Sequence, residues 1–174
     1  MIKQENSYSL WLRPSQSQID ELTKIISRLS QQYRSTSFPA HITLLHSIAA
    51  NTDTITEVCE KIIERYSTFN IALEEIAYSE AYFRNLYILT KPERKLTNIY
   101  EDTKYQLEHD TNEAYMPHVS LHYGKLEKKK QQALKEKLAN SYPNLFSCQR
   151  INLYNTTGKE SDWYLIDSFH LRQA

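Results

Sequence analysis

The sequence predicts an α+β fold in which mainly antiparallel sheets carry helices on the outside. Two observations predict this class. Stretches whose polarity alternates at every second residue, as in strands, are separated by stretches with apolar residues at every third or fourth position, as in helices. In addition, the order helix, His-x-Thr/Ser strand, helix occurs twice, around His41 and around His118. This coarse repeat predicts a single domain, residues 1–174, made of two similar lobes that face each other.

The first half of the chain predicts two strands and two helices. Residues 7–13 alternate as a strand does, with Trp11 on the less apolar face, and Pro14 ends this strand. Ser15-x-x-Gln18 has the spacing of a capping box and opens an amphipathic helix. The other two elements are a strand at 41–48 and a helix at about 53–65.

The second half of the chain predicts five strands, one of which carries the second motif, and two helices. In chain order these are strands at 69–80 and 85–91 around a bend at 81–84, a helix from 92 to about 109, the motif strand at 116–124, a helix at about 127–140, and a closing hairpin of 147–156 and 163–171. The pattern contains no linker, so it agrees with a single domain.

The composition favours a small anionic ligand over a nucleic-acid polymer. Of the 174 residues 40% are hydrophobic, and 21 basic residues balance 21 acidic ones. Proteins that grip long nucleic acids usually carry a basic excess, which is missing here. The 2 cysteines form no C-x-x-C pair, and 2 glycines are too few for a glycine-rich phosphate loop.

The location and assembly of the protein follow from similar arguments. No apolar run is long enough to span a bilayer, and residues 1–6 do not resemble a signal peptide. We therefore expect a cytoplasmic monomer that makes no contact with membranes and needs no metal or other cofactor.

Two short strands carry the candidate catalytic residues. His41 and Thr43 share one face of the strand that follows Pro39, and His118 and Ser120 share one face of the strand that follows Pro117. The opposite face of each strand is apolar, which indicates that the polar face is the one available to a ligand.

A single H-x-[ST] match is a weak signal, because roughly one such match is expected by chance in this chain. His109-Asp110-Thr111 also fits, but it falls where a helix runs into a polar loop, and we set it aside. The ordinary explanation of either remaining match is a hydrogen-bonded histidine near a strand end. The mirrored settings of His41 and His118 favour a functional pair.

Such a pair suits the opening of a cyclic phosphate diester by water. One group must take a proton from the water and another must protonate the departing oxygen, and histidine, with a pKa of about 6.5, can do either near neutral pH. The hydroxyls of Thr43 and Ser120 can donate hydrogen bonds to the non-bridging phosphate oxygens. The sequence does not decide which histidine is the base and which the acid.

The two motif strands resemble those of the 2H phosphoesterase superfamily, and longer stretches narrow the resemblance to its cyclic phosphodiesterase branch, of the plant and fungal type. These stretches are Tyr-Ser-Leu-Trp at 8–11, Pro-Ala-His-Ile-Thr at 39–43, Tyr-Phe-Arg-Asn-Leu-Tyr at 82–87 and Tyr-Met-Pro-His-Val-Ser-Leu-His-Tyr at 115–123. The resemblance implies two lobes whose antiparallel sheets face a central cleft that holds the phosphate.

By this resemblance His41 and His118 are the catalytic pair and Thr43 and Ser120 hold the phosphate. The implied substrates are ADP-ribose 1″,2″-cyclic phosphate, which arises from tRNA splicing, and nucleoside 2′,3′-cyclic phosphates. The implied products are a 1″-phosphate and a 2′-phosphate.

The resemblance also implies that Trp11, Phe83 and Tyr123 line or close the site. Phe83 falls in a predicted bend, where an exposed ring could stack on a nucleobase or a ribose. Alternation places Tyr123 on the core face of its strand instead, together with Val119 and Leu121.

The remaining histidines receive ordinary explanations. His122 stands where the family tends to have an aliphatic residue; alternation places it on the face of His118, and a structural role is favoured. His46 is expected to face away from His41, and His170 has no identifiable partner. The lysines at 125 and 128–130 are assigned to a solvated helix face.

Three other functions stay open. One is an RNA-end enzyme of the 2′-5′ ligase type, against which the zero net charge argues. Another is a metal-binding protein that uses His41, His46, His118 and His122, although no carboxylate joins them at ligand spacing. The last is a non-catalytic nucleotide-binding module.

Overall fold

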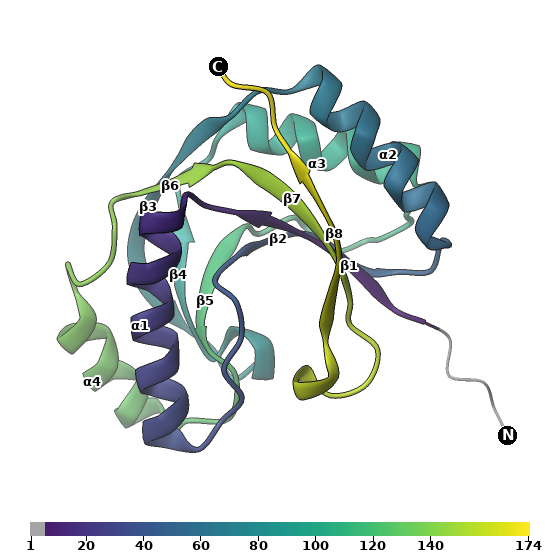
Figure 1. Ribbon diagram of the computed structural model, residues 1–174. Coiled ribbons are helices and arrows are strands. Elements are labelled where there is room, and N and C mark those ends of the chain that lie inside the picture. The colour runs from purple at the N-terminus through teal and green to yellow at the C-terminus, as the bar shows by residue number, and fades with distance from the viewer. Residues whose placement is uncertain (1–5) are drawn as a thin grey trace, which may run out of the picture.

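Eight strands form one strongly curved sheet in the order β6-β3-β4-β5-β2-β1-β7-β8, with every neighbouring pair antiparallel (Figure 1). The structure, a computed structural model, describes residues 6–174. The strands are β1 Tyr8–Arg13, β2 Ile42–Ile48, β3 Phe69–Tyr78, β4 Leu86–Thr90, β5 His118–His122, β6 Leu145–Cys148, β7 Arg150–Asn155 and β8 Tyr164–His170.

Four helices cover the outer surface of the curved sheet (Figure 1). They are α1 Gln16–Tyr33, α2 Thr52–Arg65, α3 Arg94–Gln106 and α4 Lys128–Leu138. Short 3₁₀ segments, η1 Tyr82–Arg84 and η2 Glu160–Asp162, precede β4 and β8. No helix within residues 6–174 is long and apolar enough to cross a membrane.

The sheet consists of two halves that correspond to the two predicted lobes. One half is β6-β3-β4-β5, against which α1 and α4 pack, and the other is β2-β1-β7-β8, against which α2 and α3 pack. The halves meet through one paired position, Ile42 of β2 with Val119 of β5. The predicted α+β class with outer helices is therefore confirmed, and the two predicted sheets are joined edge to edge into one.

The apolar stripes of the helices meet the outer face of the sheet. The α2 residues Ile55, Val58, Cys59 and Ile62 are buried, as the periodicity predicts. Helix α4 buries Leu134 and Leu138 together with one polar residue, Gln131, whose amide donates to the carbonyls of Ser79 and Asn85. The buried face of α4 therefore consists of two leucines and one hydrogen-bonded polar side chain.

The predicted strand at 147–156 is wrong as a single element, because the chain changes partner at Gln149. β6 pairs with β3 in one half, while β7 pairs with β1 in the other. β6 buries Phe146 and Cys148, whereas β7 is buried on both faces and places Ile151 and Leu153 in the core, so the alternation changes phase at the break. The closing hairpin is β7 and β8 alone.

The predicted capping box is also wrong. Ser15 does occupy the N-cap of α1, but its side chain makes no capping hydrogen bond. The Gln18 amide instead donates to the Leu145 carbonyl and accepts from the Ser147 N–H, both on β6. Because β6 is an edge strand with unpaired backbone groups, the Gln18 side chain bonds to these groups rather than to the start of α1.

Both motif strands carry a one-residue β-bulge directly after the motif hydroxyl. The β1–β2 register passes from Trp11 opposite Thr43 to Leu10 opposite Leu45, so Leu44 is the extra residue. The β4–β5 register passes in the same way from Ser120 to His122, so Leu121 is extra. An extra residue reverses the alternation of the side chains that follow it up to the next irregularity, which in β2 lies between Leu45 and Ile48.

Gly124, directly after β5, provides a test of this local geometry. Its φ is +143°, and an alanine Cβ there would lie 2.8 Å from Cε1 of buried His122. We expect Gly124→Ala to lower the free energy of unfolding by roughly 2–4 kcal/mol, through backbone strain and overpacking together. Urea denaturation measures the loss.

Gly158→Ala is the matched control. Its φ is +83°, but the nearest atom to a new Cβ is Oδ2 of Asp162 at 3.5 Å, which is ordinary contact. This variant should therefore lose only the strain contribution, about 1–2 kcal/mol. Equal losses in the two variants would contradict the predicted clash at His122.

Candidate active site

A cavity of about 550 Å³ lies on the inner side of the curved sheet and is lined by both halves. The seven side chains singled out by the sequence all line it: Trp11, His41, Thr43, Phe83, His118, Ser120 and Tyr123. The arrangement follows from the junction of the halves. Ile42 and Val119, paired there, are both fully buried, so in an antiparallel register the residues that flank them share the opposite, inner face.

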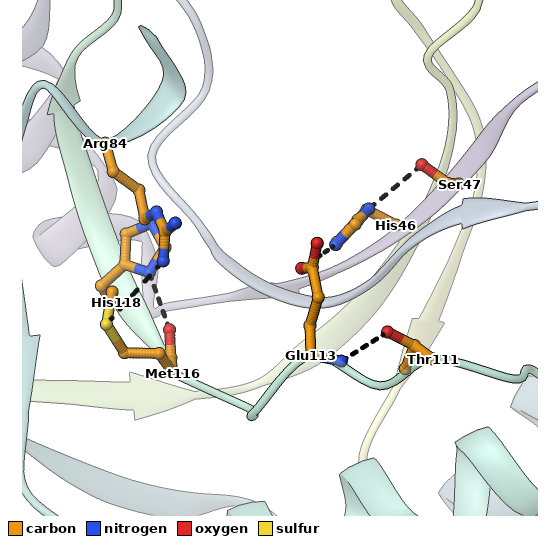
Figure 2. A network of polar contacts seen from close by, with 7 residues as sticks. All are labelled: His46, Ser47, Arg84, Thr111, Glu113, Met116 and His118. Carbon is orange, nitrogen blue, oxygen red and sulfur yellow. Dashed lines mark hydrogen bonds and ion pairs between the residues drawn. The ribbon is translucent and has the colours of Figure 1, made fainter. Parts of the chain in front are cut away.

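The two motif histidines are held in the same way by the backbone. Nδ1 of His41 lies 2.6 Å from the Pro39 carbonyl oxygen, and Nδ1 of His118 lies 2.8 Å from the Met116 carbonyl oxygen (Figure 2). A carbonyl only accepts hydrogen bonds, so Nδ1 of each ring is the atom that carries the proton. In the neutral ring Nε2 is then left with a lone pair, as a general base requires.

His41 is deeply buried beside an aromatic stack. Only 4% of its surface is exposed, and its ring stacks on Trp11 at 3.8 Å between centroids, with Tyr154 also stacked on Trp11 at 3.9 Å. Burial lowers the pKa of His41 to about 3, against the raising effect of the Pro39 carbonyl, and the charge of Arg13 lowers it further. His41 is therefore neutral at neutral pH.

His118 is half-buried and meets Tyr87 edge to face at 5.2 Å. Burial lowers its pKa below the ordinary value, the Met116 carbonyl opposes this shift, and the charge of Arg84 adds to the lowering. Tyr87 lies opposite Ser120 as Trp11 lies opposite Thr43, so the two aromatic rings occupy corresponding places in the two halves. Tyr87 was not among the residues that the sequence singled out.

The two motif hydroxyls differ from each other. The Thr43 hydroxyl makes no hydrogen bond within the described part of the chain and lines the cavity. The Ser120 hydroxyl donates to the Phe83 carbonyl at 2.9 Å and so ties η1 to β5. Only Thr43 has its hydroxyl hydrogen available without rearrangement.

Aromatic side chains from both halves form one wall of the cavity. Phe83 on η1 is 50% exposed and lies 5.1 Å from Tyr123 and 5.9 Å from Trp163, between ring centroids. Trp163 precedes β8, in the other half of the sheet, so the wall closes across the cavity. The sequence did not predict Trp163 as a site residue, because nothing in its local pattern connects it with a site formed by distant segments.

Because of the bulge in β5, the predicted faces of Tyr123 and His122 are wrong. Alternation predicts Tyr123 on the core face, but it lines the cavity and stacks on Phe38 at 3.7 Å. Alternation also predicts His122 on the face of His118, but it packs against Tyr33 of α1, with Nδ1 3.3 Å from the Asn85 side-chain oxygen. The reversed alternation after Leu121 accounts for both differences.

The bulge in β2 has the same effect on His46, and the expectation that it faces away from the cavity is wrong. His46 lines the cavity, and its Nε2 lies 3.6 Å from a carboxylate oxygen of Glu113 (Figure 2). His170 lies on β8 and is not among the residues that line the cavity. Within residues 6–174, no three His, Cys, Asp or Glu side chains are grouped to hold a metal ion, so the four-histidine metal site has no counterpart.

The curved sheet and the two facing H-x-Thr/Ser strands define the class of the protein as a 2H phosphoesterase. The fold agrees with that of LigT from E. coli in the apo form, at a TM-score of 0.64 and 13% identity over 97% of this chain and 98% of that chain. It also agrees with TT0787 of Thermus thermophilus, at a TM-score of 0.63 and 13% identity over 96% of this chain and 98% of that chain.

The chain belongs to the family described as cyclic phosphodiesterase-like protein, whose family model matches residues 6–171. A cyclic phosphodiesterase of Arabidopsis thaliana is 21% identical over 130 residues, which are 75% of this chain and 72% of that protein. The protein is therefore a phosphodiesterase of the cyclic phosphodiesterase branch.

The stacking of Trp11 on His41 predicts how the imidazoles titrate. In an NMR titration we expect the His41 signal to titrate with a pKa of about 3 and the His118 signal to titrate with a pKa below 6.5. Trp11→Leu lets water reach His41, which should raise the pKa of His41 by about one unit or more. The His118 signal, whose ring contacts Tyr87 rather than Trp11, serves as the internal control. A wild-type midpoint for His41 near its ordinary pKa would show that burial does not govern this group.

Proposed function

We propose that the protein hydrolyses small cyclic nucleotide phosphates without a metal ion, with His41 and His118 as the general acid–base pair. The observation that carries the proposal is the matched anchoring of the two imidazoles. Each Nδ1 is fixed on the carbonyl of the residue two positions earlier, and neither Nε2 has a hydrogen-bond partner within residues 6–174, although both rings line one cavity.

This anchoring serves both steps of proton transfer. In one imidazole the Nε2 lone pair takes a proton from the attacking water, and the Nδ1–H bond to the carbonyl stabilises the resulting cation. In the other, a protonated Nε2 gives its proton to the departing ribose oxygen. The P–O bond to that oxygen breaks as the P–O bond to water forms, and the product is a phosphate monoester.

We assign Thr43 as the main hydrogen-bond donor to the phosphate oxygens. Its unpaired hydroxyl can donate to a non-bridging oxygen, where charge accumulates in the transition state. Ser120 can do so only after its hydroxyl rotates away from the Phe83 carbonyl, so its contribution includes the loss of that hydrogen bond. The aromatic wall of Phe83, Tyr123 and Trp163 is a place for the base or ribose to stack.

The proposed substrates are nucleoside 2′,3′-cyclic phosphates and ADP-ribose 1″,2″-cyclic phosphate, which would yield a 2′-phosphate and a 1″-phosphate. Two findings support a nucleotide ligand. The relative from Arabidopsis thaliana is named a cyclic phosphodiesterase. LigT, which shares the fold at 13% identity, has been solved in complex with 3′-AMP. The cytoplasmic location and the monomeric state stay predictions from the sequence.

The second candidate is an RNA-end enzyme of the 2′-5′ ligase type, which the likeness to LigT fits. The charge of the cavity is the argument against it, because Arg84 is the one lysine or arginine among the described residues that line the cavity. Turnover of a 2′-5′-linked oligonucleotide at a rate comparable to that of a cyclic mononucleotide would favour this candidate.

Removal of either catalytic imidazole should abolish most of the turnover. We expect His41→Ala and His118→Ala each to lower kcat by about 10² to 10⁴ on adenosine 2′,3′-cyclic phosphate with EDTA present. His170→Ala, which removes a histidine outside the cavity, is the control and should keep wild-type kcat. Near-normal turnover in His41→Ala or His118→Ala would contradict the two-histidine mechanism, and loss of wild-type turnover in EDTA would contradict metal independence.

The two hydroxyls should differ in their importance. We expect Thr43→Val to lower kcat by about 10² or more, as is typical for a lost donor to a developing anion. Ser120→Ala should cost less, because its hydroxyl hydrogen is bonded to the Phe83 carbonyl in the free protein. Steady-state kinetics on one substrate measure both variants. A larger loss of kcat in Ser120→Ala would show that Ser120 rotates to become the main phosphate ligand.

A further inference from the structure

The described part of the chain places one permanent positive charge in the cavity. Among the residues that line it there, Arg84 is the single lysine or arginine and Glu113 the single carboxylate. The side chain of Glu113 is 79% exposed, so water screens its charge. Arg84 is therefore the group of the cavity that attracts an anion most strongly.

The Arg84 guanidinium is available to a ligand. The ion pairs found within residues 6–174 do not include it. Its one side-chain hydrogen bond there runs from Nη1 to the thioether sulfur of Met116 at 3.9 Å, and a thioether is a weak acceptor. Most of the five N–H donors are therefore available, in the planar arrangement that matches two phosphate oxygens.

Arg84 belongs to the part of the cavity that contains His118. Met116, whose sulfur contacts Arg84, is also the residue whose carbonyl oxygen lies 2.8 Å from Nδ1 of His118 (Figure 2). The charge of Arg84 accordingly lowers the pKa of His118. In the register of β2 and β5, Thr43 lies opposite His118. The donors of Arg84 and Thr43 thus come to this imidazole from different halves of the sheet.

Hydrogen bonds from neighbouring segments hold η1, the segment that carries Arg84, in a fixed position. All three of its carbonyls accept one: that of Tyr82 from the Gly124 N–H at 3.0 Å, that of Phe83 from the Ser120 hydroxyl at 2.9 Å, and that of Arg84 from the Ser79 hydroxyl at 2.7 Å. The second motif hydroxyl therefore holds η1 instead of facing a phosphate. Its half of the sheet offers a guanidinium to the ligand, as the other half offers the Thr43 hydroxyl.

The reacting phosphate needs a cation that the imidazoles do not supply in the free protein. Burial lowers the pKa of both His41 and His118, so both enter the reaction neutral. A cyclic phosphate diester has one negative charge, and more charge accumulates on its non-bridging oxygens as water attacks. Without Arg84, the described part of the cavity would offer no permanent cation to balance it.

We propose that Arg84 is a catalytic residue that binds a non-bridging oxygen of the reacting phosphate, and that Ser120 is a positioning residue that holds Arg84 in place through η1. The proposal rests on the proposed function, since it concerns the same reaction. Thr43 and Arg84 then bind the two non-bridging oxygens from opposite halves of the sheet, and the guanidinium stabilises the charge that accumulates there.

The first measurement is kcat on adenosine 2′,3′-cyclic phosphate with EDTA present. We expect Arg84→Gln to lower kcat about 10²- to 10³-fold, as is typical for a lost donor to a developing anion, and Arg84→Lys to lower it less because the charge remains. Arg94→Gln, which removes an exposed arginine of α3 outside the cavity, should keep the wild-type kcat. Near-wild-type kcat in Arg84→Gln would overturn the proposal.

Sulfur substitution tests which oxygen each residue contacts. In the two diastereomers of adenosine 2′,3′-cyclic phosphorothioate, sulfur replaces one or the other non-bridging oxygen. Arg84→Gln should remove most of the rate difference between oxygen and sulfur for one diastereomer, and Thr43→Val should do so for the other. An Arg84→Gln variant that loses the same factor on the phosphate and on both phosphorothioates would show that Arg84 does not contact the reacting phosphate.

A double-mutant cycle tests the positioning role of Ser120. If Ser120 acts through Arg84, Ser120→Ala lowers kcat in the wild type but changes it less than about twofold in the Arg84→Gln background. Equal losses in the two backgrounds would overturn this role.

If the wild type hydrolyses none of these nucleotides, the proposed function fails separately, and calorimetric binding of adenosine 2′-phosphate decides on Arg84. Binding that weakens about tenfold or more in Arg84→Gln, with Arg94→Gln unchanged, supports a phosphate contact of Arg84. Binding that is absent, or equal in wild type and Arg84→Gln, refutes it.

Discussion

The pairing of Ile42 with Val119 is the constraint on which the site depends. It is the one paired position between the two halves of the sheet within residues 6–174, and each of these residues directly follows a motif histidine. Because both point into the core, the neighbours on either side must point into the cavity. In the antiparallel register, the positions next to this pair place His41 opposite Ser120 and Thr43 opposite His118. A slip by one residue would turn all four side chains into the core.

The two halves repeat the same geometry with different chemistry. In each half a strand begins at an imidazole anchored on a carbonyl, continues to a hydroxyl, and bulges directly after it. The surroundings then diverge: His41 is stacked against Trp11, whereas His118 meets Tyr87 at its edge and has its pKa lowered further by the charge of Arg84. The repeat brings both imidazoles to one cavity, and the divergence gives the two equivalent motifs different surroundings.

Periodicity within a segment predicted the class of fold, the helices and the core face of each motif strand, because these features depend on which side of a segment is apolar. Features that depend on distant partners were not predictable in this way. The chain changes partner at Gln149, and the bulges at Leu44 and Leu121 reverse the side chains that follow them. Both features are defined by pairing with another strand, which the pattern within a segment does not contain. Trp163 reaches the site only because β8 closes the opposite half of the sheet.

Burial lowers the pKa of both imidazoles and keeps them neutral at neutral pH in the free protein, yet the proposed mechanism needs one of them charged. The substrate itself can supply the balance, because a phosphate anion in a cavity of low dielectric raises the pKa of the imidazole that faces it. In the proposed mechanism the acid is therefore formed only when a substrate is bound, and water in the empty cavity meets two neutral imidazoles. Under the proposed mechanism, in a protein of zero net charge, an anionic substrate therefore completes the acid–base pair.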